Sequence, residues 1–377
     1  MYYQRCIVLI VRQIKERQYT LEVLELTSKL LKKNPEYYTI WNMRRKILLH
    51  GLFSRSGGAI SLSIQEDMKP NTGVASQATG EPPPRSPSEP SILNVIRADL
   101  DFIFPLMVGW PKCYWIWKYR LWLLEEGNKR LKITEARELW QRELGFVSKM
   151  LTKDQRNFHG WGYRRNVVAQ LENEHLQGQS MVEAEFEYTT RMINLSLKNF
   201  SAWHSRSKLI PRLLDERKVD DNARRKFLDD GIASVLGVLC NGADSLVEFD
   251  LIIKAIYTDE YPYDQSVWFY HQFLMTTLTD PIGHSTITPN FNAEERLEYV
   301  NRQVANVKEF LDGGEDCKWA YNALVDATLA VCEMQSRVPR QDEVEDLKSW
   351  TAEVRKLDPL RHGRWDDLEQ RVLSSAR

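Results

Sequence analysis

The chain has 377 residues, enough for several compact domains or for one extended array of repeats with a continuous core. Its 51 lysines and arginines almost balance its 52 acidic residues, so the formal net charge is −1. Because proteins that bind nucleic acid normally carry a net basic surface, this balance argues against a nucleic-acid partner.

The cysteines and the apolar segments indicate where the protein works. The five cysteines are odd in number and widely spaced, and no two of them form a C-x-x-C pair. This pattern is typical of reduced intracellular thiols and favours neither a disulfide framework nor a zinc knuckle. The apolar run CIVLIV at 6–11 is too short to cross a bilayer and is not followed by a signal-peptide cleavage pattern. We therefore expect a cytoplasmic protein without a transmembrane segment.

A tryptophan-centred motif recurs along the chain. An aromatic residue lies three positions before the tryptophan in the first four copies. An arginine or, in the fifth copy, a histidine lies three positions after it. The five central residues are Trp41, Trp117, Trp161, Trp203 and Trp268, and weaker copies surround Trp319 and Trp365.

The spacing of this motif predicts a helical repeat protein. Neighbouring copies are separated by 42 residues (Trp161 to Trp203) to 76 residues (Trp41 to Trp117), a period typical of stacked supersecondary units. Between the motifs, apolar residues recur every three or four positions, for example over 136–151 and 182–197. We therefore predict an all-α fold in which each repeat is a helix, a short turn and a second helix entered through the tryptophan motif. Residues 1–377 are expected to form one domain of about six to seven such αα-hairpins.

The motif also predicts packing roles. Phe158 and Trp161 lie one helical turn apart, so both are expected to lock neighbouring helices together. The arginine three residues after each tryptophan lies on the same side of the helix. It is expected to reach carbonyl or acidic groups of the next repeat.

Two irregular segments interrupt the array. Residues 54–91 contain clustered proline, serine and glycine and few apolar residues, which predicts a disordered insertion between the first two repeats. Residues 279–293 form a second, shorter irregular segment before another helical stretch.

The sequence has no motif of a self-contained catalytic site. It contains no nucleotide-binding glycine loop, no H-E-x-x-H and no G-x-S-x-G, and its seven histidines are dispersed. From this pattern alone, the array would be an interaction protein that holds a partner on one face.

The repeats resemble those of the protein prenyltransferase alpha subunits, and among these the Rab-specific, type II members. The resemblance covers about residues 19–370 apart from the insertion. It is carried by the stretches LELTSKLLKKNPEYYTIWNMRR, RNFHGWGYRR, NFSAWHSRSKLIP, DQSVWFYHQFL and LDPLRHGRWDDLEQ. It implies that the stacked hairpins form a crescent, a right-handed superhelix.

The resemblance implies one subunit of a heterodimeric enzyme. Alpha subunits of this family wrap around a beta subunit, which carries the zinc ion and the isoprenoid pocket. The Rab-specific dimer transfers geranylgeranyl from geranylgeranyl diphosphate to C-terminal cysteines of Rab GTPases that an escort protein presents. Zinc lowers the pKa of the acceptor thiol, and the diphosphate leaving group needs basic groups placed in advance. Zinc is therefore expected in the partner and not in this chain.

The resemblance also implies site residues. The family's P-K-x-Y segment corresponds to PKCY, so Lys112 is expected to stabilise the leaving diphosphate and Tyr114 to line the site. The family's aromatic-His pair corresponds to Phe158 and His159, with His159 near the reacting end of the lipid. The residue pattern alone favours a solvated charge at a helix entry for Lys112, and a capping or surface histidine is the competing interpretation of His159.

Two alternatives remain open at this point. A noncatalytic scaffold could keep the repeats without the chemistry, although it would tolerate any residue in place of Lys112. The chain could also be an alpha subunit shared by the transferases that read a C-terminal CaaX box. Those members typically carry glutamine after the tyrosine, where it hydrogen-bonds the peptide carboxylate. Here the residue is Trp115, which has one donor and no acceptor and favours a Rab-type subunit.

Overall fold

The computed structural model describes residues 2–55, 91–233, 263–280, 286–312 and 316–375. The regular secondary structure in these ranges is entirely helical, which confirms the predicted all-α fold. The predicted insertion at 54–91 falls almost wholly outside the described residues, as does part of the irregular segment at 279–293. The chain forms two compact units, Met1–Gln179 and Ser180–Arg377.

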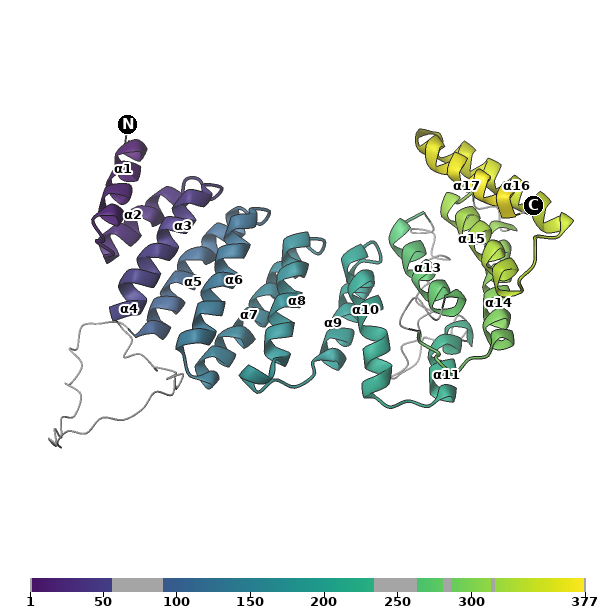
Figure 1. The fold of residues 1–377 in the computed structure, drawn as a ribbon, viewed down its shortest axis with the longest axis horizontal. Helices are drawn as coiled ribbons and strands as arrows, with labels where there is room; N and C mark the ends of the chain where they lie inside the picture. The colour runs from purple at the N-terminus through teal and green to yellow at the C-terminus, as the bar shows by residue number, and fades with distance from the viewer. Residues whose placement is uncertain (1, 56–90, 234–262, 281–285, 313–315, 376–377) are drawn as a thin grey trace, which may run out of the picture. The chain divides into compact units, whose positions relative to one another are not determined.

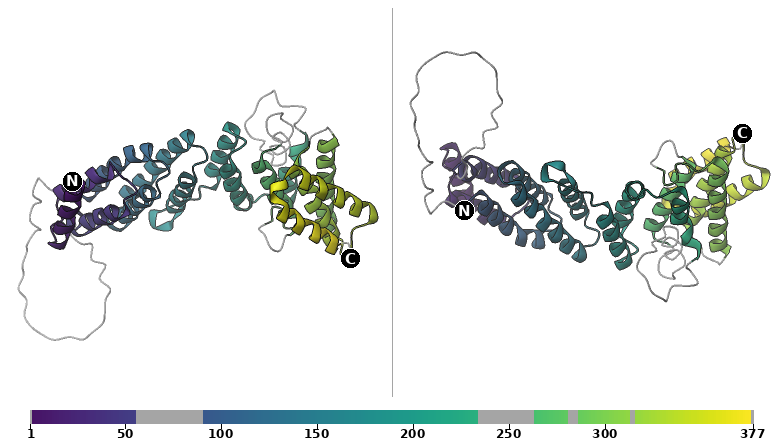
Figure 2. Two further views of the ribbon diagram at one scale, coloured as in Figure 1. Left: turned by 90° about the horizontal axis from the view of Figure 1, so that it is seen from above. Right: turned by 90° about the horizontal axis from the view of Figure 1, so that it is seen from below.

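The first unit is a stack of helical hairpins (Figure 1). Its elements are α1 (Tyr2–Lys15), α2 (Leu21–Leu31), α3 (Tyr38–Ile47), the π-helix η1 (Leu48–Leu52), α4 (Phe53–Arg55), α5 (Ile92–Gly109), α6 (Tyr114–Arg130), α7 (Ile133–Lys153), α8 (Phe158–Glu172) and the 3-10 helix η2 (Glu174–Leu176). Helix α2 packs on α3, α5 on α6 and α7 on α8. The second helices also contact one another, α3 with α6 and α6 with α8, so the hairpins stack in register, as Figure 2 shows for this unit.

The second unit continues the hairpin pattern. Its elements are α9 (Val182–Leu195), α10 (Phe200–Glu216), α11 (Asp221–Ala233), α13 (Gln265–Thr279), α14 (Ala293–Asp312), α15 (Lys318–Met334), α16 (Gln341–Leu357), the 3-10 helix η4 (Pro359–Arg361) and α17 (His362–Ser375). Helix α9 packs on α10, and α13 to α17 pack each on the next. Contacts of α10 with α13 and of α13 with α15 again join successive hairpins.

The motif tryptophan has a constant place and a constant partner. It is the fourth residue of α3, α6, α8, α10, α13 and α17. In the first four of these helices, its indole nitrogen donates a hydrogen bond of 2.8 to 2.9 Å to the carbonyl six residues earlier. The pairs are Trp41 with Pro35, Trp117 with Pro111, Trp161 with Gln155 and Trp203 with Leu197. Each tryptophan is buried and ties the turn that enters its helix to the core.

One of the weaker copies needs a correction. The fourth residue of α15 is Tyr321, whereas Trp319 is its second residue. Tyrosine therefore takes the repeat position in this hairpin, and Trp319 lies beside it, packed against Phe269 of α13 at 5.5 Å between ring centroids. The assignment of Trp319 as a repeat centre is wrong by two residues.

The aromatic residue before the tryptophan does not pack in the core, which contradicts the prediction for Phe158. Phe158 is 76% exposed, whereas Trp161 is 2% exposed. The same holds for the other first residues of these helices, Tyr38, Tyr114 and Phe200, which are about half exposed. The physical reason is that the first residue of a helix projects beyond its N-terminal end, where no neighbouring helix covers it.

The arginine after the tryptophan reaches the next repeat in the first two copies, which confirms its predicted role there. In both copies a buried arginine forms an ion pair with an acid on the first helix of the next hairpin, and a tyrosine hydroxyl of that hairpin's second helix donates to the same acid. These groups are Arg44, Asp99 and Tyr119, then Arg120, Glu143 and Tyr163. The groups satisfy one another, so the buried charges are paired and hydrogen-bonded.

Candidate functional site

Lys112 lies in the short turn between α5 and α6. The Trp117 indole holds this turn through the Pro111 carbonyl at 2.9 Å. The Lys112 side chain is 65% exposed, and its Nζ atom lies 2.5 Å from Oδ2 of Asp154, the C-cap residue directly after α7. The predicted cation is therefore presented to solvent, with an acidic partner that the sequence did not indicate.

Tyr114 and His159 lie next to this turn. Tyr114 is the first residue of α6 and His159 the second residue of α8, and their ring centroids are 6.1 Å apart. The structure thus brings Tyr114 and His159 together, and Lys112 lies two residues before Tyr114. Both side chains lie at helix N-termini, where the helix dipole and unpaired N–H groups favour negative charge. The Lys112 ammonium lies close to both helix ends and is paired with the Asp154 carboxylate.

Asn157 joins the two turns and was missed by the sequence reasoning. Its side chain accepts a hydrogen bond from the Gly160 N–H at 3.1 Å and so caps α8. Its amide nitrogen also donates to the Pro111 carbonyl at 3.1 Å. The start of α8 is therefore fixed to the turn that carries Lys112. The signal available in the sequence was an asparagine directly before the predicted helix start, which is a preferred N-cap.

Exposed aromatic side chains extend the site along the hairpin ends. The Trp115 ring contacts Tyr38 and Tyr114, with centroid distances of 5.4 and 5.2 Å. The Phe158 ring lies 5.7 Å from His159. We call Tyr38, Trp115, Tyr114, His159 and Phe158 the aromatic row. It lines one end of the stacked helices α3, α6 and α8. Tyr38, Tyr114 and Phe158 are exposed, whereas Trp115 and His159 are half-buried.

Cys113 lies beside Lys112 but is not a reactive thiol. Its side chain is buried with its sulfur 3.5 Å from the Pro35 carbonyl oxygen, and burial raises the pKa of the thiol to about 11. Since the thiolate is the nucleophilic form, Cys113 remains protonated at neutral pH and has a packing role.

The described residues contain no group of three or more histidine, cysteine, aspartate or glutamate side chains that could hold a metal ion.

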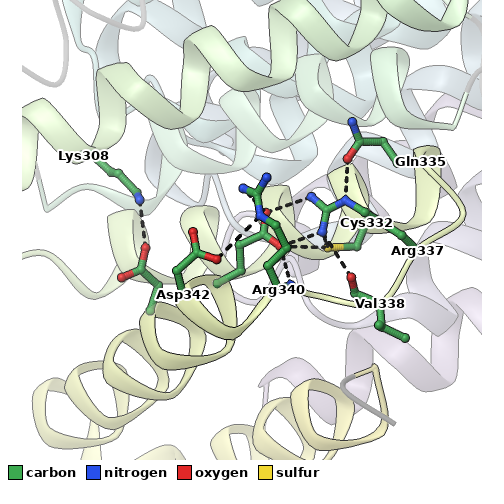
Figure 3. Close-up of polar contacts among 9 residues, drawn as sticks. Lys308, Cys332, Gln335, Arg337, Val338, Arg340 and Asp342 are labelled. Atoms are coloured by element: carbon green, nitrogen blue, oxygen red, sulfur yellow. Dashed lines mark hydrogen bonds and ion pairs between the residues drawn. The ribbon is translucent and has the colours of Figure 1, made fainter.

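Cys332 lies in a hydrogen-bonded cluster with Arg337 and Glu343 (Figure 3). Its sulfur accepts from Nη1 of Arg337 at 3.3 Å, and the same guanidinium donates to Glu343 at 2.6 and 2.8 Å. This hydrogen bonding lowers the pKa of Glu343 to about 2, so the cluster links α15 to the start of α16 as a salt bridge.

The second unit contains a cavity of about 440 Å³ between α13, α15 and α17. Its walls include Trp268, Met275, Trp319 and Met334. None of the predicted site residues lines it, so the site predicted from the sequence is the exposed end of the first unit's hairpins and not this cavity.

In the part of the chain that the structure describes, no helix is both long and apolar enough to cross a membrane.

Comparisons with known proteins place the chain among prenyltransferase subunits. The family model "Protein prenyltransferase alpha subunit repeat" matches residues 20–51, 140–171 and 182–213. The chain is 33% identical to the geranylgeranyl transferase type-2 subunit alpha of Candida albicans, over 93% of this chain and 85% of that protein. It is 30% identical to the subunit of the same name from Schizosaccharomyces pombe, over 95% of this chain and 87% of that protein.

The fold also occurs among solved structures, of which we describe one. It is the Candida albicans protein geranylgeranyltransferase-I complexed with GGPP. The TM-score is 0.55 at 18% sequence identity, and the match covers 98% of this chain and 90% of that chain. At this identity, the likeness supports the shared helical-repeat architecture alone.

Proposed function

The chain belongs to the family of geranylgeranyl transferase type-2 alpha subunits, and from this premise we propose that it is the alpha subunit of a heterodimeric protein geranylgeranyltransferase. The substrates would be geranylgeranyl diphosphate and the C-terminal cysteines of Rab GTPases presented by an escort protein. The observation that carries this proposal is the identity of 33% and 30% to the two type-2 alpha subunits named above, over 85% and 87% of their length. A cytoplasmic location fits such a reaction.

The beta subunit would supply the zinc ion, which lowers the pKa of the acceptor thiol. The reaction forms a bond between the cysteine sulfur and C1 of the lipid and breaks the bond from C1 to the diphosphate oxygen. The electron pair of that bond leaves with the diphosphate. This chain's contribution would lie at the leaving group, where negative charge develops and prearranged cations and donors lower the barrier.

Lys112, Tyr114 and His159 are the residues that we assign to this role. The Lys112 ammonium would donate to the leaving diphosphate, and the Tyr114 hydroxyl and His159 imidazole would line the same space. Three observations support the assignment: the Lys112 side chain is exposed, the Tyr114 and His159 rings lie 6.1 Å apart, and both rings are at helix N-termini.

The aromatic row supports a partner at this face. Three of its members, Tyr38, Tyr114 and Phe158, are about half exposed or more. Contiguous exposed apolar surface of this kind typically marks a protein interface. We propose that the beta subunit covers the aromatic row, and we expect the isolated alpha subunit to aggregate or to be poorly stable.

The test is a transfer assay on the complex of this chain with a type-2 beta subunit, supplied with geranylgeranyl diphosphate, zinc, a Rab GTPase and an escort protein. Lys112→Ala is expected to slow transfer by about 10- to 1000-fold, by analogy with the loss of one preorganised donor at a developing negative charge. The matched control is Lys198→Ala. Lys198 is also exposed and also lies five residues before a motif tryptophan, Trp203, so its loss should leave the rate within about twofold.

The outcomes separate the parts of the proposal. If the complex transfers lipid and Lys112→Ala is as fast as the parent, the enzyme assignment stands and the placement of the site on Lys112 is wrong. If no complex with a beta subunit forms, the chain is a scaffold that has kept the repeats. Tyr114→Phe and His159→Ala, assayed in the same way, test the two remaining site residues.

A further inference from the structure

We propose that Asp154 competes with the diphosphate for Lys112. The Lys112 ammonium pairs with the Asp154 carboxylate when no diphosphate is bound, and it pairs with the diphosphate when one binds. This inference rests on the proposed function of Lys112. It starts from one contact, the 2.5 Å ion pair between Nζ of Lys112 and Oδ2 of Asp154. The pair joins the α5–α6 turn to the end of α7.

The pair can open without disturbing the fold. The two side chains are 65% and 35% exposed, and an exposed ion pair of this kind changes an equilibrium constant by only about two- to fivefold. The lysine has a flexible four-carbon stem and three donors, so it can turn toward a second anion. A diphosphate carries more negative charge than one carboxylate and therefore attracts the ammonium more strongly at the same distance.

Asp154 is held by its backbone and does not follow the lysine. Its N–H donates to the Met150 carbonyl at 3.1 Å, and its own carbonyl accepts from the Asn157 N–H at 3.1 Å. Asn157 in turn binds the Pro111 carbonyl, so the two turns remain joined when the ion pair opens. Removing the charge of Asp154 should therefore change the electrostatics of Lys112 and leave the turns in place.

The last two hairpins contain a related pair that provides a control. Asp358 lies seven residues before Trp365, just as Asp154 lies seven residues before Trp161. Its Oδ2 atom is 2.7 Å from Nζ of Lys318 at the start of α15. Here the side chains are only 26% and 11% exposed, so this pair is more enclosed and has no assigned substrate.

The competition predicts the direction in which pyrophosphate affinity changes when Asp154 loses its charge. While Asp154 is ionised, a diphosphate must displace it from Lys112, which weakens diphosphate binding and speeds the release of the pyrophosphate product. Neutralising Asp154 should therefore tighten the binding of inorganic pyrophosphate. If Asp154 instead only orients Lys112, its loss should weaken pyrophosphate binding.

The experiment measures inhibition of the heterodimer's transfer reaction by inorganic pyrophosphate. Asp154→Asn, which keeps the shape of the side chain, is expected to lower the pyrophosphate inhibition constant by about two- to fivefold. Asp358→Asn is expected to leave it unchanged. Asp154→Ser removes the same charge and serves if the first variant does not assemble with the beta subunit.

A double variant decides whether the effect passes through Lys112. In the Lys112→Ala background, Asp154→Asn should no longer change the inhibition constant, because there is no cation to release. If Asp154→Asn still lowers the pyrophosphate inhibition constant in that background, the Asp154 charge acts on pyrophosphate directly through its electrostatic field and not through Lys112. That result would overturn the competition. Unchanged or weaker pyrophosphate binding by Asp154→Asn, with Lys112→Ala still slow, would overturn the competition alone. An unaffected Lys112→Ala enzyme would overturn the site placement and this inference together.

Discussion

The guanidinium of Arg120 and the carboxylate of Glu143 form a two-pronged ion pair in which both hydrogen bonds are 2.7 Å long. Both side chains are almost completely buried, and the hydroxyl of Tyr163 donates to the same carboxylate at 2.7 Å. The three groups come from α6, α7 and α8. They therefore fix the hairpin that carries Tyr114 to the hairpin that carries His159.

Removing the acid of this pair should be costly. Glu143→Gln keeps the shape but leaves the Arg120 charge buried without its counter-charge, which typically destabilises a protein by about 3 to 5 kcal/mol. We expect a loss of that order in the free energy of unfolding measured by chemical denaturation. The matched control on the same helix is Glu138→Gln, which removes a surface contact with Arg97 and should cost less than about 1 kcal/mol. Equal losses for the two variants would contradict the assigned role of the buried pair.

Two aromatic residues one turn apart on α8 should differ sharply in their effect on stability. Trp161→Ala removes a buried ring together with its 2.8 Å hydrogen bond to the Gln155 carbonyl, and we expect a loss of about 3 to 5 kcal/mol. Phe158→Ala removes a ring that is 76% exposed, so the expected change is within about 0.5 kcal/mol. Thermal or denaturant unfolding of the two variants measures both. A large loss for Phe158→Ala would mean that the ring is packed after all.

The fifth copy of the motif should make stability depend on pH through His271, which replaces the arginine of the first four copies. This side chain is buried in α13, and burial lowers its pKa to about 4, partly offset by a hydrogen bond with Gln303. Because the unfolded chain binds the proton more readily, the contribution of the neutral histidine is complete above about pH 6.5 and is lost as the pH falls toward 4. The loss would approach about 3 kcal/mol.

The measurement is denaturant unfolding at pH 7 and at pH 4.5 for the parent and for His271→Gln. Carboxylates elsewhere also titrate in this range, so the difference between the two proteins isolates the histidine. The parent should lose more stability than the variant on acidification. Parallel losses would show that His271 does not contribute to the pH dependence.

Much of the fold could be predicted because the motif of each repeat consists of residues that lie close together in the sequence. The tryptophan motif marks helix starts that the structure places three residues before Trp41, Trp117, Trp161, Trp203 and Trp268. The predicted repeat centre at Trp319 was wrong. The sequence shows a tryptophan there, but the repeat position, the fourth residue of α15, is filled by Tyr321. A pattern matched by residue type cannot recognise a position at which another aromatic takes over the packing.

The candidate site was predicted in part. Lys112, Tyr114 and His159 were named from a resemblance, and their roles remain proposals, but the structure brings the Tyr114 and His159 rings together. Asp154 and Asn157 were not named. Their importance comes from contacts across 42 and 46 residues of sequence, to Lys112 and to the Pro111 carbonyl.

The sequence by itself determined the helical repeats, the buried tryptophan of every motif copy except the one assigned to Trp319, and the class of protein to which the chain belongs. These follow from residues a few positions apart, because helix formation and the burial of one helix face depend on near neighbours along the chain. Only the tertiary structure decided that Phe158 is exposed, that Arg120 and Glu143 are paired out of water, and that Asp154 faces Lys112. Those outcomes depend on which hairpin ends are covered by a neighbour and which are left in solvent, and that is settled by stacking between repeats and not within any one of them.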